Sequence, residues 1–103
     1  MTESLQKALD TIIEVANPDK VILFGSFARG EETPDSDYDF LVLKKGIKRR
    51  RKLAQKLYRS FIGVGVPIDV IVNELLEYEE LKKESYMIYK TIDEEGIVLY
   101  VKN

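Results

Sequence analysis

The sequence predicts an α/β fold in which a small mixed sheet of about four strands is packed by helices. Segments with apolar residues at helical spacing alternate along the chain with short runs rich in β-branched and aromatic residues, a pattern typical of helices layered on a sheet. The chain has 103 residues, of which 45% are hydrophobic and 33% charged, and this composition is typical of one globular domain with a single core. We therefore expect one domain over residues 1–103.

Proline and glycine residues divide the first half of the chain. Helical spacing of apolar side chains predicts a helix over residues 3–16, which ends at Asn17 because proline disfavours helical backbone in the residue before it. The apolar run over residues 21–24 lacks alternation, as expected for a strand covered on both faces. We then expect a short helical turn over residues 26–30, an exposed polar loop over residues 30–36 and a second strand over residues 39–43.

In the second half of the chain, the sequence pattern predicts two more helical segments and two more strands. The first helix follows Gly46, ends before Gly63, and has its apolar face at residues 53, 54, 57, 58 and 61. Residues 66–72 form a third strand, and a charged helical segment then continues to about Glu95, where Gly96 is placed to cap it. Residues 97–101 form the fourth strand. The candidate buried positions of the charged segment are Leu81, Met87, Ile88 and Ile92.

The composition excludes several classes of chemistry. The chain has no cysteine and no histidine, which excludes disulfides, thiol nucleophiles, Cys/His zinc sites and catalytic pairs that contain either residue. Carboxylates must therefore carry any catalysis. The longest apolar runs are four or five residues and the N-terminus is charged, so we expect no transmembrane helix, no signal peptide and a cytoplasmic location.

Three aspartates are the candidate catalytic residues. Asp37 and Asp39 mark the start of the second predicted strand, where alternation places both carboxylates on one face, about 6.6 Å apart, and Tyr38 on the other. Asp69 interrupts the third strand, where its apolar neighbours predict burial, and an unpaired buried carboxylate is unfavourable. If the two strands are neighbours, about 4.8 Å apart, Asp69 lies beside Asp37 and Asp39.

Carboxylates gathered in this way repel one another, by about 3 kcal/mol per pair at ~5 Å and an effective dielectric constant of about 20. Divalent cations relieve the repulsion, and hard oxygen ligands favour Mg²⁺ or Mn²⁺. Two such ions stabilise the attacking and leaving oxygens of a phosphoryl-type transfer, while the third carboxylate can act as a base. The alternative is structural: a turn or cap at residues 35–37, a solvated Asp39 and an isolated strand charge at Asp69.

Gly25 and Ser26 follow the first predicted strand and are candidate phosphate-binding residues. The backbone N–H groups beyond Gly25 are available to an anion, Gly25 permits close approach of a phosphate, and Ser26 adds a hydroxyl. Arg29 lies one turn later and can reach a phosphate. The alternatives are an ordinary glycine-serine helix start and a surface salt bridge from Arg29 to Glu31 or Glu32.

Together these motifs resemble the signature of the DNA polymerase β-like nucleotidyltransferase superfamily: Gly25-Ser26, ten intervening residues, Asp37-Tyr38-Asp39, and Asp69 in an apolar strand. Residues 24–30, FGSFARG, followed by SDYD at residues 36–39, resemble more narrowly the minimal nucleotidyltransferases, short antitoxin-like proteins that often pair with a HEPN-domain protein in a two-gene system. The resemblance implies a nucleotidyltransferase fold, two Mg²⁺ ions held by the three aspartates, and a triphosphate bound at Gly25 and Ser26.

Charge is distributed unevenly, although the formal net charge is only −2. Seven of the 16 basic residues lie within residues 44–52, and eight of the 18 acidic residues lie within residues 74–95. The basic run is either the solvated face of a helix or an electrostatic patch for polyphosphate or RNA. Tyr78, Tyr86 and Tyr89 form either a partner-binding face or part of ordinary helix packing.

We therefore expect a metal-dependent nucleotidyltransferase that moves a nucleoside monophosphate, AMP from ATP in the favoured case, to a hydroxyl and releases pyrophosphate. Because 103 residues leave no second wall for a large acceptor, we expect a partner protein, of HEPN type by the resemblance. It would dock beside the 30–36 loop and the 44–52 patch, both at the mouth of the site. The alternative is a non-catalytic antitoxin that acts by contact. Nucleic acid is a less favoured partner, and the oligomeric state is open.

Overall fold

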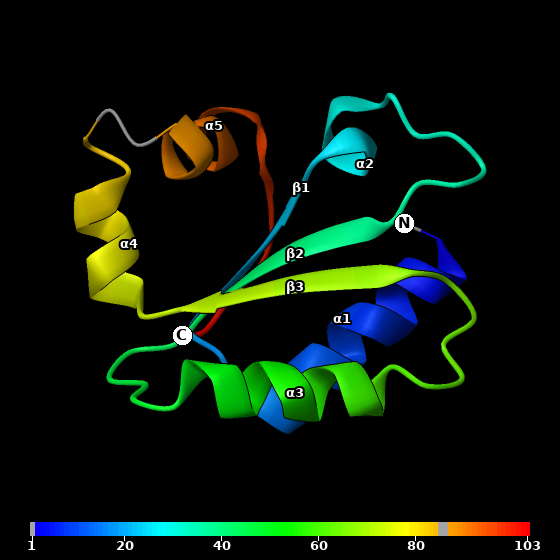
Figure 1. The fold of residues 1–103 in the computed structure, drawn as a ribbon, viewed down its shortest axis with the longest axis horizontal. Coiled ribbons are helices and arrows are strands. Elements are labelled where there is room, and N and C mark those ends of the chain that lie inside the picture. The colour runs from blue at the N-terminus through cyan, green and yellow to red at the C-terminus, as the bar shows by residue number, and fades with distance from the viewer. Residues whose placement is uncertain (1, 85–86) are drawn as a thin grey trace.

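The computed structural model describes residues 2–84 and 87–103 and contains the expected mixed sheet of four strands (Figure 1). The strand order is β3-β2-β1-β4, in which β1 runs antiparallel to both its neighbours and β2 runs parallel to β3. The two edges of the sheet are therefore β3 and β4. The strands are β1 (Lys20–Phe24), β2 (Tyr38–Leu43), β3 (Ile68–Asn73) and β4 (Ile97–Val101).

Helices cover both faces of this sheet (Figure 1). Two pack on one face, two lie on the other, and a short helix follows β1. No helix within the described residues is long and apolar enough to cross a membrane. The helices are α1 (Glu3–Ala16) and α3 (Arg50–Ser60) on the first face, α4 (Leu75–Leu81) and α5 (Met87–Glu95) on the second, and α2 (Ser26–Arg29).

The first helix begins and ends where the sequence predicts. The side chain of Thr2 accepts a hydrogen bond from the backbone N–H of Leu5 at 3.2 Å, which satisfies one of the free amides at the start of α1. At the other end Asn17 adopts a left-handed conformation with φ 45°, and its N–H bonds to the carbonyl of Ile13. The buried face of α1 consists of Leu5, Ala8, Leu9, Ile12 and Ala16.

The pleat of the strands divides the apolar residues between two clusters. The first cluster joins Phe40 and Val42 of β2 to α1 and α3, and the second joins Leu41 and Leu43 to α4 and α5. Because side chains alternate, Asp39 and Asp69 share the face of Leu41, toward α4 and α5. Both central strands are thus covered on both faces, as their continuous apolar runs predict.

The charged segment after β3 differs from its prediction. It forms two helices instead of one, and its most deeply buried side chain is Tyr78, at 0% exposure. Burial raises the pKa of Tyr78 to about 12, mainly because the phenolate loses its hydration. Ile92 is buried as expected, whereas the expected burial of Ile88 is wrong because it lies 52% exposed, and Leu81 is half-buried. Tyr86 and the side chain of Met87 lie outside the described residues.

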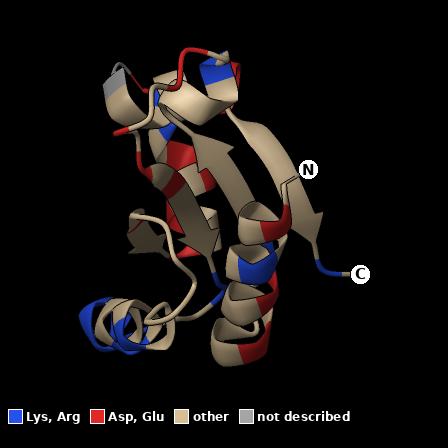
Figure 2. Ribbon diagram, turned by 90° about the vertical axis from the view of Figure 1, so that its right-hand side faces the viewer, with Lys and Arg blue, Asp and Glu red and all other residues tan. Residues whose placement is uncertain are grey.

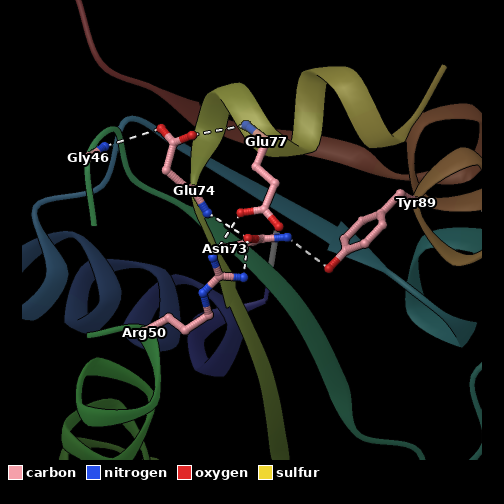
Figure 3. Close-up of polar contacts among 6 residues, drawn as sticks. All are labelled: Gly46, Arg50, Asn73, Glu74, Glu77 and Tyr89. Atoms are coloured by element: carbon pink, nitrogen blue, oxygen red, sulfur yellow. Dashed lines mark hydrogen bonds and ion pairs between the residues drawn. The ribbon is translucent and has the colours of Figure 1, made fainter. Parts of the chain in front are cut away.

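Tyr78 therefore belongs to the core, and Tyr89 takes part in a polar network centred on the buried side chain of Asn73 (Figure 3). Asn73 ends β3 with only 1% exposure. Its Oδ1 accepts hydrogen bonds from Arg50 Nη1 at 2.6 Å and from the Glu74 N–H at 2.8 Å, and its Nδ2 donates to the Tyr89 hydroxyl at 2.9 Å. Arg50 also pairs with Glu77 at 2.8 Å. One side chain thus joins α3, β3, α4 and α5.

We expect Asn73→Ala to lower the free energy of unfolding by about 2 kcal/mol, because it leaves Arg50 and Tyr89 without their shared buried partner. Urea unfolding followed by circular dichroism measures this change. Gln55→Ala, on the exposed side of α3, is the control and should change the value by less than about 0.5 kcal/mol. Equal stability of Asn73→Ala and the parent would show that the network does not hold the helices.

Candidate active site

The three candidate aspartates lie at one end of the sheet. In the parallel pair β2–β3, Asp39 stands directly opposite Asp69, and Asp37 lies one residue before β2. Because β1 runs antiparallel to β2, with Phe24 opposite Asp39, the turn at Gly25 reaches the same end. The second and third strands are therefore adjacent in the sheet, which was the condition for Asp69 to lie beside Asp37 and Asp39.

Tyr38, between the two aspartates, points to the other face, as alternation predicts. Its side chain is buried with 4% exposure, and its ring lies 4.3 Å from that of Phe27, measured between centroids. Its hydroxyl is within hydrogen-bond distance of the hydroxyls of Thr2, at 2.9 Å, and Ser4, at 3.0 Å. Tyr38 therefore anchors the start of β2 to α1 and α2 and leaves the opposite face to the carboxylates.

Gly25 is in direct contact with Asp39. A Cβ atom at residue 25 would overlap Asp39 Oδ2, at a separation that real side chains do not show. The backbone of Gly25 also has φ 76°, a conformation that favours glycine. Two features thus favour glycine at residue 25: its backbone conformation, with φ 76° and ψ −156°, and the Asp39 carboxylate, which would have to move to make room for a Cβ. Ser26 follows, half-buried, as the first residue of α2.

The environment of Asp39 disfavours its ionised form. Its pKa is raised above the ordinary value, first because of burial and then because of the charges of Asp69 and Asp37, with Arg29 acting in the opposite sense. The charges of Asp69 and Asp37 therefore act on Asp39. A divalent cation would favour the ionised form by supplying opposite charge at this position.

The expected burial of Asp69 is wrong, because its side chain is exposed. It is the second residue of β3, which is an edge strand of the sheet. Its hydrogen-bond partner is Tyr58 of α3, whose hydroxyl donates to Asp69 Oδ1 at 3.3 Å and accepts from the Val70 N–H at 3.0 Å. Sequence reasoning assigned Tyr58 to the apolar face of α3. It is in fact 43% exposed and reaches the open edge of β3.

The donor set suits a hard divalent cation, since all its charged ligand atoms are carboxylate oxygens. Within the described residues, however, no group of three or more His, Cys, Asp or Glu side chains is close enough together to hold a metal ion. The aspartates therefore share one end of the sheet without forming a closed set of ligands. Asp39 is central, because it lies in register with Asp69 and against Gly25.

Arg29 forms the salt bridge that was the alternative to phosphate binding. Its guanidinium pairs with Glu31 and, at 3.7 Å, with Glu95 of α5. The hydrogen bond to Glu31 is the first cause of its raised pKa, and the charge of Asp39 contributes less. A phosphate that binds Arg29 would compete with two exposed carboxylates. Nothing in the spacing of the sequence indicates Glu95 as a neighbour.

A cavity of about 400 Å³ opens beside Gly25 and Arg29. Its opposite wall is α5, and this wall was not expected from the sequence, which gave the charged helical segment no role at the site. Ile88 lines this cavity, which explains in part why its apolar side chain is exposed. Besides Gly25 and Arg29, the lining residues are Phe24, Ile88, Thr91, Ile92 and Glu95.

The two segments expected to flank the site lie at opposite ends of the sheet (Figure 1). The 30–36 loop lies where β2 and β3 begin, beside the aspartates, and most of it is exposed as predicted. Residues 44–52 begin where β2 ends, so the expectation that this basic patch flanks the site is wrong. The reason is geometric: β2 carries the chain from one end of the sheet to the other between Asp39 and Lys44.

The architecture is that of the nucleotidyltransferase fold. A toxin–antitoxin structure with AMP-PNP superposes with a TM-score of 0.60 at 22% identity and covers 99% of this chain and 76% of its own. A structure from Sulfolobus solfataricus, named "putative nucleotidyltransferase", gives 0.61 at 19% identity and covers 99% and 90%. The chain belongs to the nucleotidyltransferase domain family, which matches residues 4–99. The resemblance seen in the sequence is thereby confirmed.

Two curated relatives come from Methanocaldococcus jannaschii, and each is named "putative protein adenylyltransferase". The first is 37% identical over 84 residues, which cover 79% of this chain and 77% of the relative. The second is 29% identical over 85 residues, which cover 82% and 83%. Both alignments extend over most of either chain.

We expect Asp39→Asn to be more stable than the parent at pH 7 without divalent cations. A raised pKa means that the folded state binds the proton more tightly than the unfolded state, so ionisation of Asp39 costs stability as the pH rises through that range. The advantage of the variant should shrink at pH 3, where both states are largely protonated. Thermal unfolding at the two pH values tests this, with Asp35→Asn in the exposed loop as control. If Asp39→Asn were less stable than the parent by the same amount at both pH values, the prediction would be contradicted.

Proposed function

We propose that the chain is a metal-dependent nucleotidyltransferase that transfers AMP from ATP to a hydroxyl of a partner protein. The observation that carries the proposal is the position of Asp39, which lies in register with Asp69, near Asp37, and in contact with the Gly25 turn. A carboxylate group and a backbone turn open to a phosphate thus adjoin each other. Membership of the nucleotidyltransferase family supports transfer of a nucleotidyl group.

The roles proposed for the residues at this end of the sheet are those that the resemblance to the minimal nucleotidyltransferases implies. Asp37, Asp39 and Asp69 would hold two Mg²⁺ ions, which supply positive charge to the triphosphate and to the attacking oxygen. Gly25 and Ser26 would bind the phosphates through the backbone and the Ser26 hydroxyl, and the cavity between α2 and α5 would receive the nucleoside. Arg29 would exchange Glu31 and Glu95 for phosphate oxygens.

In the proposed reaction, the acceptor oxygen bonds to the α-phosphorus and the bond from that phosphorus to the oxygen bridging to the β-phosphate breaks. Pyrophosphate leaves with that oxygen, and the acceptor proton passes to a carboxylate, for which Asp69 is suited because its side chain is exposed at the open edge of β3. The Tyr58 hydroxyl positions Asp69 for this step. The acceptor hydroxyl must be held about 3–3.5 Å from the phosphorus, and we infer that the surface of a second protein holds it there.

A partner protein would supply that surface, beside the exposed 30–36 loop, which adjoins the aspartates. The names of the two relatives favour a protein acceptor and AMP. The toxin–antitoxin neighbour with AMP-PNP favours an adenine nucleotide and a two-protein system. We therefore infer a HEPN-type partner, as the minimal nucleotidyltransferase motif implies.

The direct test incubates the purified chain with labelled ATP, GTP, CTP and UTP, with and without the protein encoded beside it. We expect label from ATP on the partner, with a mass increase of one or more AMP groups by mass spectrometry. The label should be lost in the Asp37→Asn, Asp39→Asn double variant, with Asp35→Asn as control. An unmodified partner that the double variant still binds and neutralises would instead identify a non-catalytic antitoxin.

Nucleotide binding should depend on Gly25 far more than on Gly30. Both glycines have positive φ, but Gly25 combines φ 76° with ψ −156°, a conformation almost confined to glycine, whereas Gly30 is left-handed with φ 71° and ψ 24°. In addition, only at Gly25 would a Cβ meet another side chain, that of Asp39. Gly25→Ala should therefore lose most affinity for a non-hydrolysable ATP analogue with Mg²⁺, whereas Gly30→Ala should bear backbone strain alone. Calorimetric titration compares the two variants, after circular dichroism has verified their fold. Equal binding by both would mean that the contact with Asp39 has no part in the site.

A further inference from the structure

A basic stripe runs along α3, on the face of the sheet opposite α4, α5 and the cavity beside Gly25. Arg49, Lys52, Lys56 and Arg59 follow one another at intervals of three, four and three residues, which places them on one side of the helix. All four side chains are exposed. Figure 2 shows blue concentrated on α3, which carries no red, whereas α1 carries both colours.

Several features distinguish this stripe from an ordinary solvated helix face. Residues 44–60 contain nine Lys and Arg and no Asp or Glu. In the described part of the chain, Arg50 is paired with Glu77, but the four residues of the basic stripe take part in no ion pair. The first turn of α3 contains no acidic residue. Basic groups there oppose the helix dipole, and like charges three or four residues apart repel, so the stripe lowers the stability of α3.

A cavity of about 300 Å³ lies along the stripe, between α3 and the end of α1. Arg49, Lys52 and Lys56 line it together with aliphatic side chains such as Val15 and Leu53. Lys44, also in the lining, is already used within the fold, because its Nζ donates to the Ala16 carbonyl at 2.7 Å. The surface therefore combines free cations with an apolar hollow that has room for an unstacked base.

We propose that this surface binds the phosphodiester backbone of a single-stranded nucleic acid. The four cations span ten residues of helical rise, about 15 Å, with neighbours about 5–6 Å apart, a regular spacing suited to successive phosphates. The electrostatic attraction of phosphates to the protein is confined to this surface, because the chain as a whole carries a formal net charge of −2. The site is separate from the nucleotide cavity, so the two binding activities are separable by substitution.

The test measures fluorescence polarisation of a labelled 12-nucleotide oligouridylate RNA at several salt concentrations, with EDTA present so that the proposed metal site is not engaged. Each phosphate contact to a single strand contributes about 0.7 to the slope of log K against log[salt]. The triple variant Arg49→Ala, Lys52→Ala and Lys56→Ala should therefore lower the slope by about 2 and weaken binding at least about tenfold at low salt.

The matched control is Lys7→Ala, Lys83→Ala and Lys90→Ala, which removes the same charge from exposed positions elsewhere and should retain most of the RNA affinity. Both variants should bind the ATP analogue with Mg²⁺ as the parent does. Failure of the parent to bind RNA, or an equal loss in both variants, would overturn the proposal. Displacement of the RNA by polyglutamate of equal charge would also overturn it and would assign the surface to an acidic protein.

Discussion

The close approach of Asp39 to Gly25 is the constraint on which the rest of the site depends. Asp39 stands opposite Asp69 because β2 and β3 are parallel, and against Gly25 because β1 runs antiparallel to β2 and ends there. Gly25 has a backbone conformation that favours glycine and leaves no room for a Cβ beside the Asp39 carboxylate as it stands, so the Gly25 turn and the carboxylates adjoin each other. The same arrangement brings three negative charges together, and the raised pKa of Asp39 reflects its burial and their repulsion.

This arrangement costs stability, and the surrounding structure offsets that cost. Apolar residues of β1 and β2 pack on both faces of the sheet, so the strands that bear Asp39 and Gly25 have little freedom to separate. At the far end of β3, the Asn73 network fixes α5 through Tyr89, and α5 in turn forms the wall of the cavity beside Gly25. The distant polar network and the site are therefore mechanically connected through one short helix.

Most of the helices and strands could be predicted from the sequence because they depend on the local periodicity of apolar residues. The four strands, α1, α3 and the glycine turn follow from runs and breaks in the apolar pattern. Long-range placement could not be predicted in the same way. Asp69 is exposed because β3 is an edge strand, Tyr58 reaches it around that edge, and Arg29 meets Glu95 of α5, 66 residues later in the chain. The prediction that the basic residues 44–52 flank the site was wrong because the length of β2 separates them from Asp39.

The central claim is that divalent cations bind at the end of the sheet that carries Asp37, Asp39 and Asp69. Paramagnetic Mn²⁺ tests it most directly, by broadening amide NMR signals near the bound ion when added in trace amounts with a non-hydrolysable ATP analogue. The account predicts selective broadening at Gly25, at the three aspartates and along the first residues of β2 and β3. The signals of Asn73, at the opposite end of β3, should stay sharp. Uniform broadening, or broadening centred on the acidic helices α4 and α5, would contradict the account.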